Sequence, residues 1–358
     1  MHQKTDLLIS DLLRLNNDSD CHIIHWNSYE VSKLDGIFSI PHLVEENADY
    51  FKSKYLSLIY DFGEAKINEK RVIDHLLIRQ NFSYWWMTLF VEKCNFIKSP
   101  QIDNIIKIMA LELWLKENQY HKIKLLSSNE HLANSILQLS EILSIDFEWE
   151  KQQNKKIHNS LPRRFFHSLP NIFKSPIWLL TYVFSNWVLR GEGVDLWRKS
   201  NATTTFVSYF FNLVPNAVKE GRYESRYWTK LNDLLDDKNH SSNWLHIYVR
   251  DGILTSSRKA RNFIRQLNSS QIDHQVHVTL ASFLSAKVIL LTLKDWLKVQ
   301  KLNKLVNTKL KETSGYLWPL FIKDSQDSMS GIPAMNNLLD LNLFERAMFE
   351  LPAQERGC

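Results

Sequence analysis

Short apolar runs alternate with longer amphipathic stretches along the first 150 residues, and this alternation predicts an α/β fold. The apolar runs are bounded by polar or turn-forming residues, as short strands are, at residues 21–26, 55–60, 123–126 and 147–149. Apolar residues recur every three or four positions over residues 102–113 and 132–143, which places them on one face of a helix. Because strands and helices follow one another in turn, we expect parallel strands joined by right-handed crossovers, and hence a Rossmann-like sheet with flanking helices.

Polar residues mark where these two helices begin. Ser99 suits the N-cap of the first helix, and Pro100 suits its first position. Ser127 and Glu130 have the spacing of a capping box before the second helix. Each helix start also offers backbone N–H groups that can bind the phosphates of a ligand. Both interpretations, a cap and a phosphate site, remain open at this point.

A basic, aromatic segment at residues 151–201 interrupts this rhythm. From 151 to 191 it contains seven Lys and Arg residues and no Asp or Glu; because the whole chain carries +5, the rest is slightly acidic. Its apolar portion, 177–189, is shorter than the ~20 residues that a membrane-spanning helix needs. Cations mixed with aromatic residues predict a helical insertion that lies in the interface of an anionic membrane. The alternative is an insertion packed against the protein, with lysine side chains at its edges.

A second α/β region begins near residue 202. Residues 203–211 are rich in β-branched and aromatic side chains and predict a strand, and residues 244–249 predict another. Helical segments follow, and the last, 287–311, is rich in lysine, which usually marks a solvent-exposed helix face. The predicted organisation is an N-terminal α/β region at 1–150, the helical insertion at 151–201 and the second α/β region at 202–358.

The composition limits the classes of site. Only 9 glycines occur among 358 residues, and neither a G-x-G-x-x-G nor a G-x-x-x-x-G-K motif is present, so no dinucleotide or P-loop site is expected. Three cysteines without repeated spacing are typical of a reducing compartment, and the N-terminus lacks the uninterrupted apolar run of a secretory signal. We therefore expect a cytoplasmic protein without a cofactor.

No metal site is expected either. The Asp-x-Asp triplet at residues 18–20 precedes a predicted strand, whereas paired carboxylates that hold a divalent cation against a diphosphate stand at a strand end. Two histidine pairs fall on predicted strands, where a spacing of three residues sends side chains to opposite faces: His22/His25 and His274/His277.

The most informative stretch is residues 82–100, where tryptophans, a tyrosine, hydroxyls, lysines and a carboxylate stand together. Ser83, Tyr84, Trp85 and Trp86 combine large aromatic faces with polar groups, a mixture that binds sugar rings. We expect Ser83, Trp85 and Trp86 to lie at or near a cleft beside the strand ends, with at least one of the two tryptophan rings accessible. An aromatic cluster of this kind also suits a protein core, so this alternative stays open.

Five stretches, at residues 39–41, 55–63, 82–100, 206–209 and 223–228, together resemble a family of bacterial surface carbohydrate biosynthesis proteins. The resemblance covers nearly the whole chain. Members of that family are regarded as glycosyltransferases of capsule or O-antigen loci, and the resemblance identifies no catalytic residues. Family members continue past the equivalent of residues 345–352 into a further α/β region, so the resemblance implies that this chain lacks the C-terminal part.

For such an enzyme without an Asp-x-Asp triplet at a strand end, we expect the metal-independent, two-domain GT-B plan. The diphosphate of a nucleotide-activated sugar is then held by helix N-termini and basic side chains. In the first region, the substrate-binding candidates besides the aromatic cluster are Lys98, Ser99, Ser127 and Asn129. In the second region they combine hydroxyl, cationic and aromatic groups: Asn212, Arg222, Ser225, Arg226, Tyr227 and Trp228.

A general base that deprotonates the acceptor is expected among three residues. Glu92 is the carboxylate closest in sequence to the aromatic cluster, and Asp74 and His75 are the alternatives. Lys93 stands next to Glu92, and an ordinary surface ion pair between the two is an equally good interpretation.

The favoured function is a glycosyltransferase of bacterial surface polysaccharide biosynthesis at the cytoplasmic face of the plasma membrane. Its partners are then a nucleotide-activated sugar, a lipid-linked glycan acceptor and, through residues 151–191, the anionic membrane surface. The alternative is a non-catalytic module that binds the glycan or scaffolds a biosynthetic complex. A nucleic-acid-binding protein ranks last, because the chain outside the basic segment is slightly acidic and no nucleic-acid-binding motif occurs.

Overall fold

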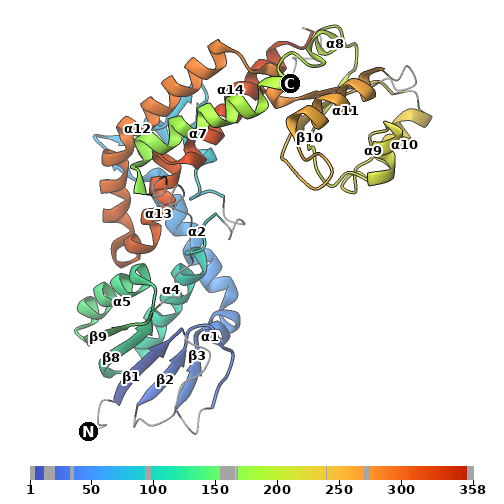
Figure 1. Ribbon diagram of the computed structural model, residues 1–358. Helices are drawn as coiled ribbons and strands as arrows, with labels where there is room; N and C mark the ends of the chain where they lie inside the picture. The colour runs from blue at the N-terminus through green and yellow to red at the C-terminus, as the bar shows by residue number, and fades with distance from the viewer. Residues whose placement is uncertain are drawn as a thin grey trace. The chain divides into compact units, whose positions relative to one another are not determined.

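The computed structural model describes residues 5–11, 21–32, 36–92, 98–153, 166, 168–238, 240–269 and 275–352. The chain divides into two compact units, each made of two segments of the sequence. Unit 1 comprises Met1–Leu169 and Val299–Ser330, and unit 2 comprises Pro170–Lys298 and Gly331–Cys358. Both units combine helices with parallel strands (Figure 1).

Unit 1 contains a five-stranded sheet in which all neighbouring strands are parallel. In spatial order the strands are β3 (Ile37–Ser39), β2 (His22–His25), β1 (Thr5–Ser10), β8 (Tyr120–Ser127) and β9 (Asp146–Lys151). The register places Leu7 of β1 beside His22 of β2 and Ile123 of β8. Leu7, Ile9, Ile123 and Leu125 are buried, so the core of the sheet lies along its two central strands.

Helices surround this sheet and extend unit 1 beyond it. Those near the sheet in Figure 1 are α1 (Ile40–Glu46), α4 (Ile102–Glu117) and α5 (Glu130–Leu143). The others are α2 (Ala48–Glu64), α3 (Val72–His75), the part of α12 (Ala286–Ser314) from Val299 onward, and α13 (Trp318–Met329). Short elements complete the unit: the antiparallel pairs β4 (Lys66–Ile67) with β5 (Lys70–Arg71) and β6 (Leu77–Arg79) with β7 (Phe82–Ser83), and the 3₁₀ helices η1 (Tyr84–Met87) and η4 (Gly315–Leu317).

Unit 2 is built around a three-stranded parallel sheet. Its strands are β10 (Thr204–Tyr209), β11 (Ser242–Ile247) and β12 (Gln275–Thr279), in that spatial order. The first residues of α12 belong to this unit, together with α7 (Asn171–Asn186), η2 (Trp187–Leu189), α8 (Val194–Arg198), α9 (Pro215–Glu220), α10 (Leu231–Asp237), α11 (Ser257–Ser269), η3 (Leu280–Phe283) and α14 (Ile332–Phe349).

The predicted α/β class, with parallel strands and flanking helices, is confirmed. Strands occur at the predicted runs 21–26, 123–126, 147–149, 203–211 and 244–249. The strand predicted at 55–60 is wrong, because these residues form part of α2. Phe51, Tyr55, Ile59 and Phe62 are buried at helical spacing, so the burial of one helix face outweighs the β-propensity of this run.

Both predicted helix caps are also wrong. Gln101 occupies the N-cap position of α4, and Asn129 is the N-cap of α5, where its side chain accepts a hydrogen bond from the Leu132 N–H at 3.2 Å. The Ser127 hydroxyl accepts instead from the Asn129 N–H at 3.0 Å. Asn129 therefore performs the capping that the spacing of Ser127 and Glu130 suggested.

The basic, aromatic segment contributes to both units. Residues up to Leu169 belong to unit 1 and those from Pro170 to unit 2, where α7 carries most of the apolar portion. The return of Val299–Ser330 to unit 1 differs from the predicted division into consecutive regions. Among the described residues, no helix combines the length and the apolar character that crossing a membrane requires.

Candidate functional site

The candidate site lies at the carboxyl edge of the unit 1 sheet. β1 is the central strand; β2 and β3 lie on one side of it, and β8 and β9 on the other. From β1 the chain continues to β2 on one side, and from β8 it continues to β9 on the other side. This switch point, where the strand order reverses, is the place where open parallel sheets bind their ligands.

Asp11 and Ser127 meet at the switch point. Asp11 directly follows β1, and Ser127 is the last residue of β8. The Ser127 hydroxyl donates a hydrogen bond to Asp11 Oδ2 at 2.5 Å and is itself fully buried. A carboxylate has about four lone-pair positions, so this contact orients Asp11 and leaves it able to accept further hydrogen bonds.

A chain of side-chain hydrogen bonds runs from α5 to the end of β2. Asn129 Nδ2 donates to Gln101 Oε1 at 3.3 Å, and Asn104 Nδ2 donates to the same oxygen at 2.7 Å. Trp26, which follows β2, donates from Nε1 to Asn104 Oδ1 at 2.7 Å. Because Gln101 precedes α4 and Asn129 precedes α5, the N-terminal ends of both helices meet at this edge of the sheet.

Lys107 adds a cation to the network. Its side chain is 9 % exposed, and its ammonium group lies 2.6 Å from the Asp103 carboxylate and 3.0 Å from Asn27 Oδ1. Asn27 Nδ2 in turn donates to the Asp11 backbone carbonyl at 3.2 Å. The switch point thus combines a cation, amide donors and a carboxylate acceptor, which are the groups that bind a ligand carrying phosphates and hydroxyls.

His25 places an imidazole at the same edge. It is the last residue of β2, is paired in register with Ser10 of β1, and is 6 % exposed. Its Nδ1 atom has no hydrogen-bond partner among the described residues. From the sequence, we did not expect this histidine to bind a metal, and nothing in the sequence indicated that it lies at the same sheet edge as Asp11.

Two of the predicted substrate-binding residues of unit 1, Ser127 and Asn129, belong to the switch-point network. Lys98 and Ser99 contact α13 instead. The Lys98 carbonyl accepts a hydrogen bond from Lys323 Nζ at 3.2 Å, and the Lys98 ammonium pairs with Glu92 at 2.9 Å. Ser99 is fully buried.

The aromatic cluster divides between core and surface. Ser83 is the N-cap of η1 and donates to the Ile73 carbonyl at 2.6 Å, while the Tyr84 hydroxyl donates to the Ser328 carbonyl at 2.7 Å. Trp85 is buried and stacks on Phe90, with ring centroids 5.7 Å apart. Trp86 is 58 % exposed, so one of the two tryptophan rings is accessible, as expected.

The three predicted bases are each engaged by a neighbour. Glu92 pairs with Lys98. Asp74 receives two hydrogen bonds from the Arg71 guanidinium, at 2.7 and 2.9 Å, and these lower the pKa of its carboxyl group. His75 Nε2 donates to the Ile67 carbonyl at 2.9 Å. A lowered pKa makes Asp74 a weak base near neutral pH.

Asp324 of α13 is a titratable residue that sequence reasoning missed. It is 2 % exposed, and burial raises the pKa of its carboxyl group to about 6, although the neighbouring Ser99 hydroxyl and Lys323 ammonium oppose this shift. A carboxyl group with such a pKa can exchange protons near neutral pH. Little in the sequence indicates this, because the burial of Asp324 can be recognised only when the buried face of α13 is known.

In unit 2 the structure brings several predicted residues together after β10. Asn212 has a positive φ of 58° and its carbonyl accepts a hydrogen bond from the Arg226 N–H at 2.9 Å, next to a bridge between Leu213 and Ser225. Tyr227 is 65 % exposed.

The two remaining candidates of unit 2 make other contacts. Trp228 Nε1 donates to Ser208 Oγ at 2.8 Å, and Arg222 pairs with Glu220 at 2.8 Å.

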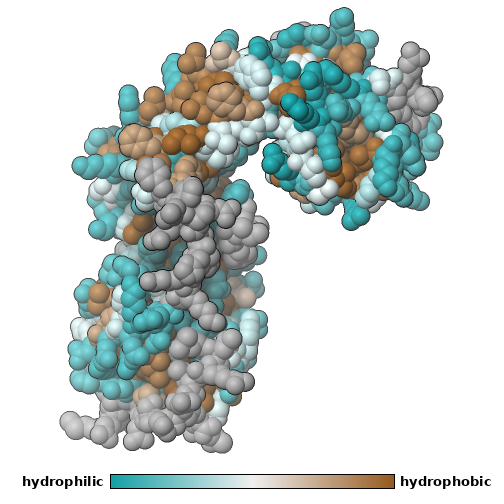
Figure 2. Space-filling model, viewed as in Figure 1, coloured by the Kyte–Doolittle hydropathy of each residue, from teal (hydrophilic) through white to brown (hydrophobic). Residues whose placement is uncertain are grey.

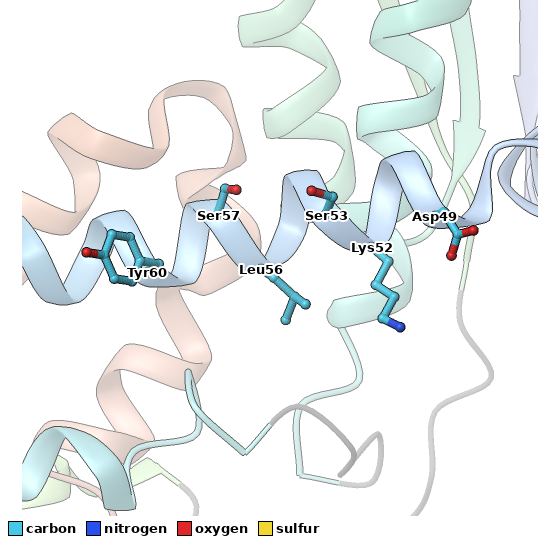
Figure 3. Close-up of a pocket in the computed structure, with 6 residues that line it drawn as sticks. All are labelled: Asp49, Lys52, Ser53, Leu56, Ser57 and Tyr60. Carbon is cyan, nitrogen blue, oxygen red and sulfur yellow. The ribbon is translucent and has the colours of Figure 1, made fainter.

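Three surface hollows are lined by residues that do not belong to the switch-point network. One, of about 480 Å³, is lined by six residues that all belong to α2, as Figure 3 shows with the side chains from Asp49 to Tyr60 spread along one helix. A single helix offers few polar groups that converge on a ligand. Another, of about 520 Å³, includes Lys66, Lys301 and Lys304, and a third, of about 410 Å³, lies between α12 and α14 of unit 2.

The described residues contain no group of three or more His, Cys, Asp and Glu side chains placed to hold a metal ion. The Asp-x-Asp triplet at residues 18–20 and His274 lie outside the described residues.

No protein-family model, no curated protein and no solved structure matches this chain.

Proposed function

We propose that this chain is a metal-independent glycosyltransferase of bacterial surface polysaccharide biosynthesis with a GT-B-like plan, and that its nucleotide-activated sugar binds at the switch point of unit 1. The observation that carries the proposal is the network of Asp11, Lys107, Ser127 and Asn129 at the carboxyl ends of β1 and β8. The sequence resemblance to surface carbohydrate biosynthesis proteins supports the reaction class.

The network contains groups that can bind both the diphosphate and the hydroxyl groups of a nucleotide-activated sugar. A diphosphate needs positive potential, which the N-terminal ends of α4 and α5 and the Lys107 ammonium group supply without a metal ion. Ribose and the transferred sugar present hydroxyl groups, for which the Asp11 carboxylate is an acceptor. In this proposal Lys107 contacts a phosphate, Asp11 a hydroxyl group, and Asn129 holds Gln101 in place between them.

The acceptor in this proposal is a lipid-linked glycan at the cytoplasmic face of the plasma membrane. Two observations support this location: the acid-free sequence from 151 to 191, and the apolar side chains that α7 exposes to solvent. An enzyme that acts on a membrane-borne acceptor gains from attachment to the same surface.

Calorimetric titration of nucleoside diphosphates and cytidine monophosphate into the protein tests the binding site. Replacement of Lys107 by Met is expected to weaken nucleotide binding by about 10-fold or more, or about 1.4 kcal/mol, because the charge that faces the phosphates is lost. The matched control is Lys116→Met on the same helix, whose lysine is 57 % exposed and pairs with Glu112. Equal affinity of the Lys107→Met protein, or binding that a chelator abolishes, would contradict the proposal.

A non-catalytic glycan-binding role is the second candidate, and the exposed ring of Trp86 favours it. In that case a Trp86→Ala protein loses affinity for the polysaccharide while its affinity for nucleotides does not change. Binding of the glycan without transfer of radiolabelled sugar from any nucleotide donor would identify this role.

A further inference from the structure

The helix α7 of unit 2 turns its apolar side toward solvent. Five large side chains stand at intervals of four, three, four and three residues, and so on one helix face: Phe173, Ile177, Leu180, Phe184 and Trp187. Their exposed fractions are 58, 42, 54, 79 and 46 %, respectively. A surface helix of a globular protein normally directs its polar side to solvent. This face of α7 therefore has no partner that the described part of unit 2 supplies.

The opposite side of α7 is already anchored. Ser175, Leu179 and Val183 are buried, and the helix packs against α14. The packing of unit 2 thus uses one side of α7 and leaves the other side available, and the five exposed residues are not needed to hold the helix in place.

The charged residues of α7, and Arg190 directly after η2, are all cationic. α7 and η2 contain no Asp or Glu; Lys174 belongs to α7, and the Arg190 guanidinium lies 4.8 Å from the centre of the Trp187 ring. The start of α12, which also packs near α14, exposes Leu290 and Leu297 among lysines. Figure 2 shows hydrophobic surface over α7 and α12 on the face in view.

We propose that the exposed face of α7 docks onto an anionic lipid surface, with the helix lying in the plane of the interface. Five apolar side chains over about four turns match the shallow burial of an interfacial helix, and flanking cations meet the anionic headgroups. A symmetric dimer through this face is disfavoured, since it would bring Lys174 and Arg190 of two copies together without a counter-ion from α7. The inference does not depend on the proposed chemistry at the switch point.

Vesicle sedimentation of the intact chain tests the docking surface. We compare vesicles of phosphatidylcholine alone with vesicles that also contain phosphatidylglycerol, and expect binding mainly to the latter. The variant Phe173→Ser/Phe184→Ser is expected to reduce the partition coefficient by about 100-fold, since two of the most exposed rings can no longer insert. The matched control is Leu234→Ser, which removes a side chain of α10 that is 55 % exposed in the same unit. The melting temperature should stay unchanged in both proteins, because all three side chains are on the surface.

A fluorescent label provides a second readout that does not depend on loss of binding. An environment-sensitive dye on Leu180→Cys, in a chain whose native cysteines are replaced by serine, should shift to shorter wavelength with anionic vesicles. The same dye on Leu234→Cys should not shift. Equal vesicle binding by the Phe173→Ser/Phe184→Ser variant and the unmodified protein would overturn the proposal. A second outcome would also overturn it: the unmodified chain self-associates but does not bind the vesicles, and the variant no longer self-associates. The exposed face of α7 would then be a protein interface.

Discussion

Acidification is expected to destabilise unit 2 through a buried pair of histidines. His246 of β11 and His277 of β12 are 0 and 1 % exposed, and His246 Nε2 lies 3.0 Å from His277 Nδ1. They sit in an aromatic cluster in which Phe210 stacks on His246 with ring centroids 4.3 Å apart. Burial lowers the pKa of His277 to about 3, and burial together with the nearby His277 lowers the pKa of His246 well below 6.5.

The sign and size of the effect follow from the two protonation equilibria. Both imidazoles are neutral in the folded unit, whereas each titrates near pH 6.5 in the unfolded chain. Below pH 6.5 the unfolded chain therefore binds more protons, so the stability is fully present above this pH and is lost as the pH falls toward 3. With a folded pKa of about 3, His277 lowers the free energy of unfolding by about 2 kcal/mol between pH 7.5 and 5, and His246 lowers it further in the same direction. Domains are stable by about 5–15 kcal/mol, so the effect is large.

Hydrogen exchange measured by mass spectrometry on peptides that cover β11 and β12 is the direct assay. After correction for the intrinsic exchange rate, the loss of about 2 kcal/mol from His277 alone raises the opening constant by about 30-fold at pH 5 relative to pH 7.5, and His246 raises it further. The variant His277→Gln should show a smaller dependence, because only His246 then titrates in this pair. His121→Gln, at an exposed position of unit 1, should leave it unchanged. The reasoning is refuted if opening of β11 and β12 is the same at both pH values, or if His277→Gln retains the full dependence.

Three further substitutions have expected outcomes. Asp324→Asn should raise the stability of unit 1 at pH 8 by up to about 3 kcal/mol and change it little at pH 4, because a carboxyl group with a folded pKa of about 6 destabilises the fold only when ionised; urea unfolding at the two pH values measures this. Gly193→Ala should destabilise unit 2 by more than about 1–2 kcal/mol in thermal unfolding, since Gly193 has a φ of +75° and the new Cβ would lie 2.7 Å from the His277 carbonyl oxygen. Tyr84→Phe should cost unit 1 about 1 kcal/mol in urea unfolding through loss of the hydrogen bond to Ser328.

Local patterns were sufficient to predict β2, β8, β9, β10 and β11, but neither the central strand β1 nor the assembly of the two units. Residues 123–126 and 244–249 are short apolar runs with turn residues at both ends; the first lies within β8, and the second overlaps β11 up to residue 247. Residues 55–60 have a similar composition, and they are helical because the buried positions of α2 recur over 17 residues, beyond the run itself. Val299–Ser330 belongs to unit 1 because of contacts between residues that are distant in sequence. The hydrophobic periodicity of a single sequence predicts helices and strands, but it does not predict such contacts.

The candidate site was predictable only where it coincides with a helix start. Ser127 and Asn129 were found through the capping signal before α5, although Asn129 rather than Ser127 caps the helix. Asp11 and Asn27 are ordinary polar residues after apolar runs, and their significance depends on the strand order, which places the ends of β1, β2 and β8 side by side. Trp85 and Trp86 are adjacent in η1, and only the structure shows which ring is buried.

Lys107 is the residue whose position is hardest to explain by folding alone. It lies in the second turn of α4, where the helix dipole disfavours a cation, and its side chain is 9 % exposed. Its counter-ion Asp103 has a side chain that is 57 % exposed, and an exposed partner offsets little of the cost of burying an ammonium group. A methionine of similar length would fill the same space without that cost. A negatively charged ligand at the switch point would turn the buried ammonium group from a destabilising into a stabilising feature, so nucleotide binding should raise the melting temperature of the unmodified protein more than that of Lys107→Met.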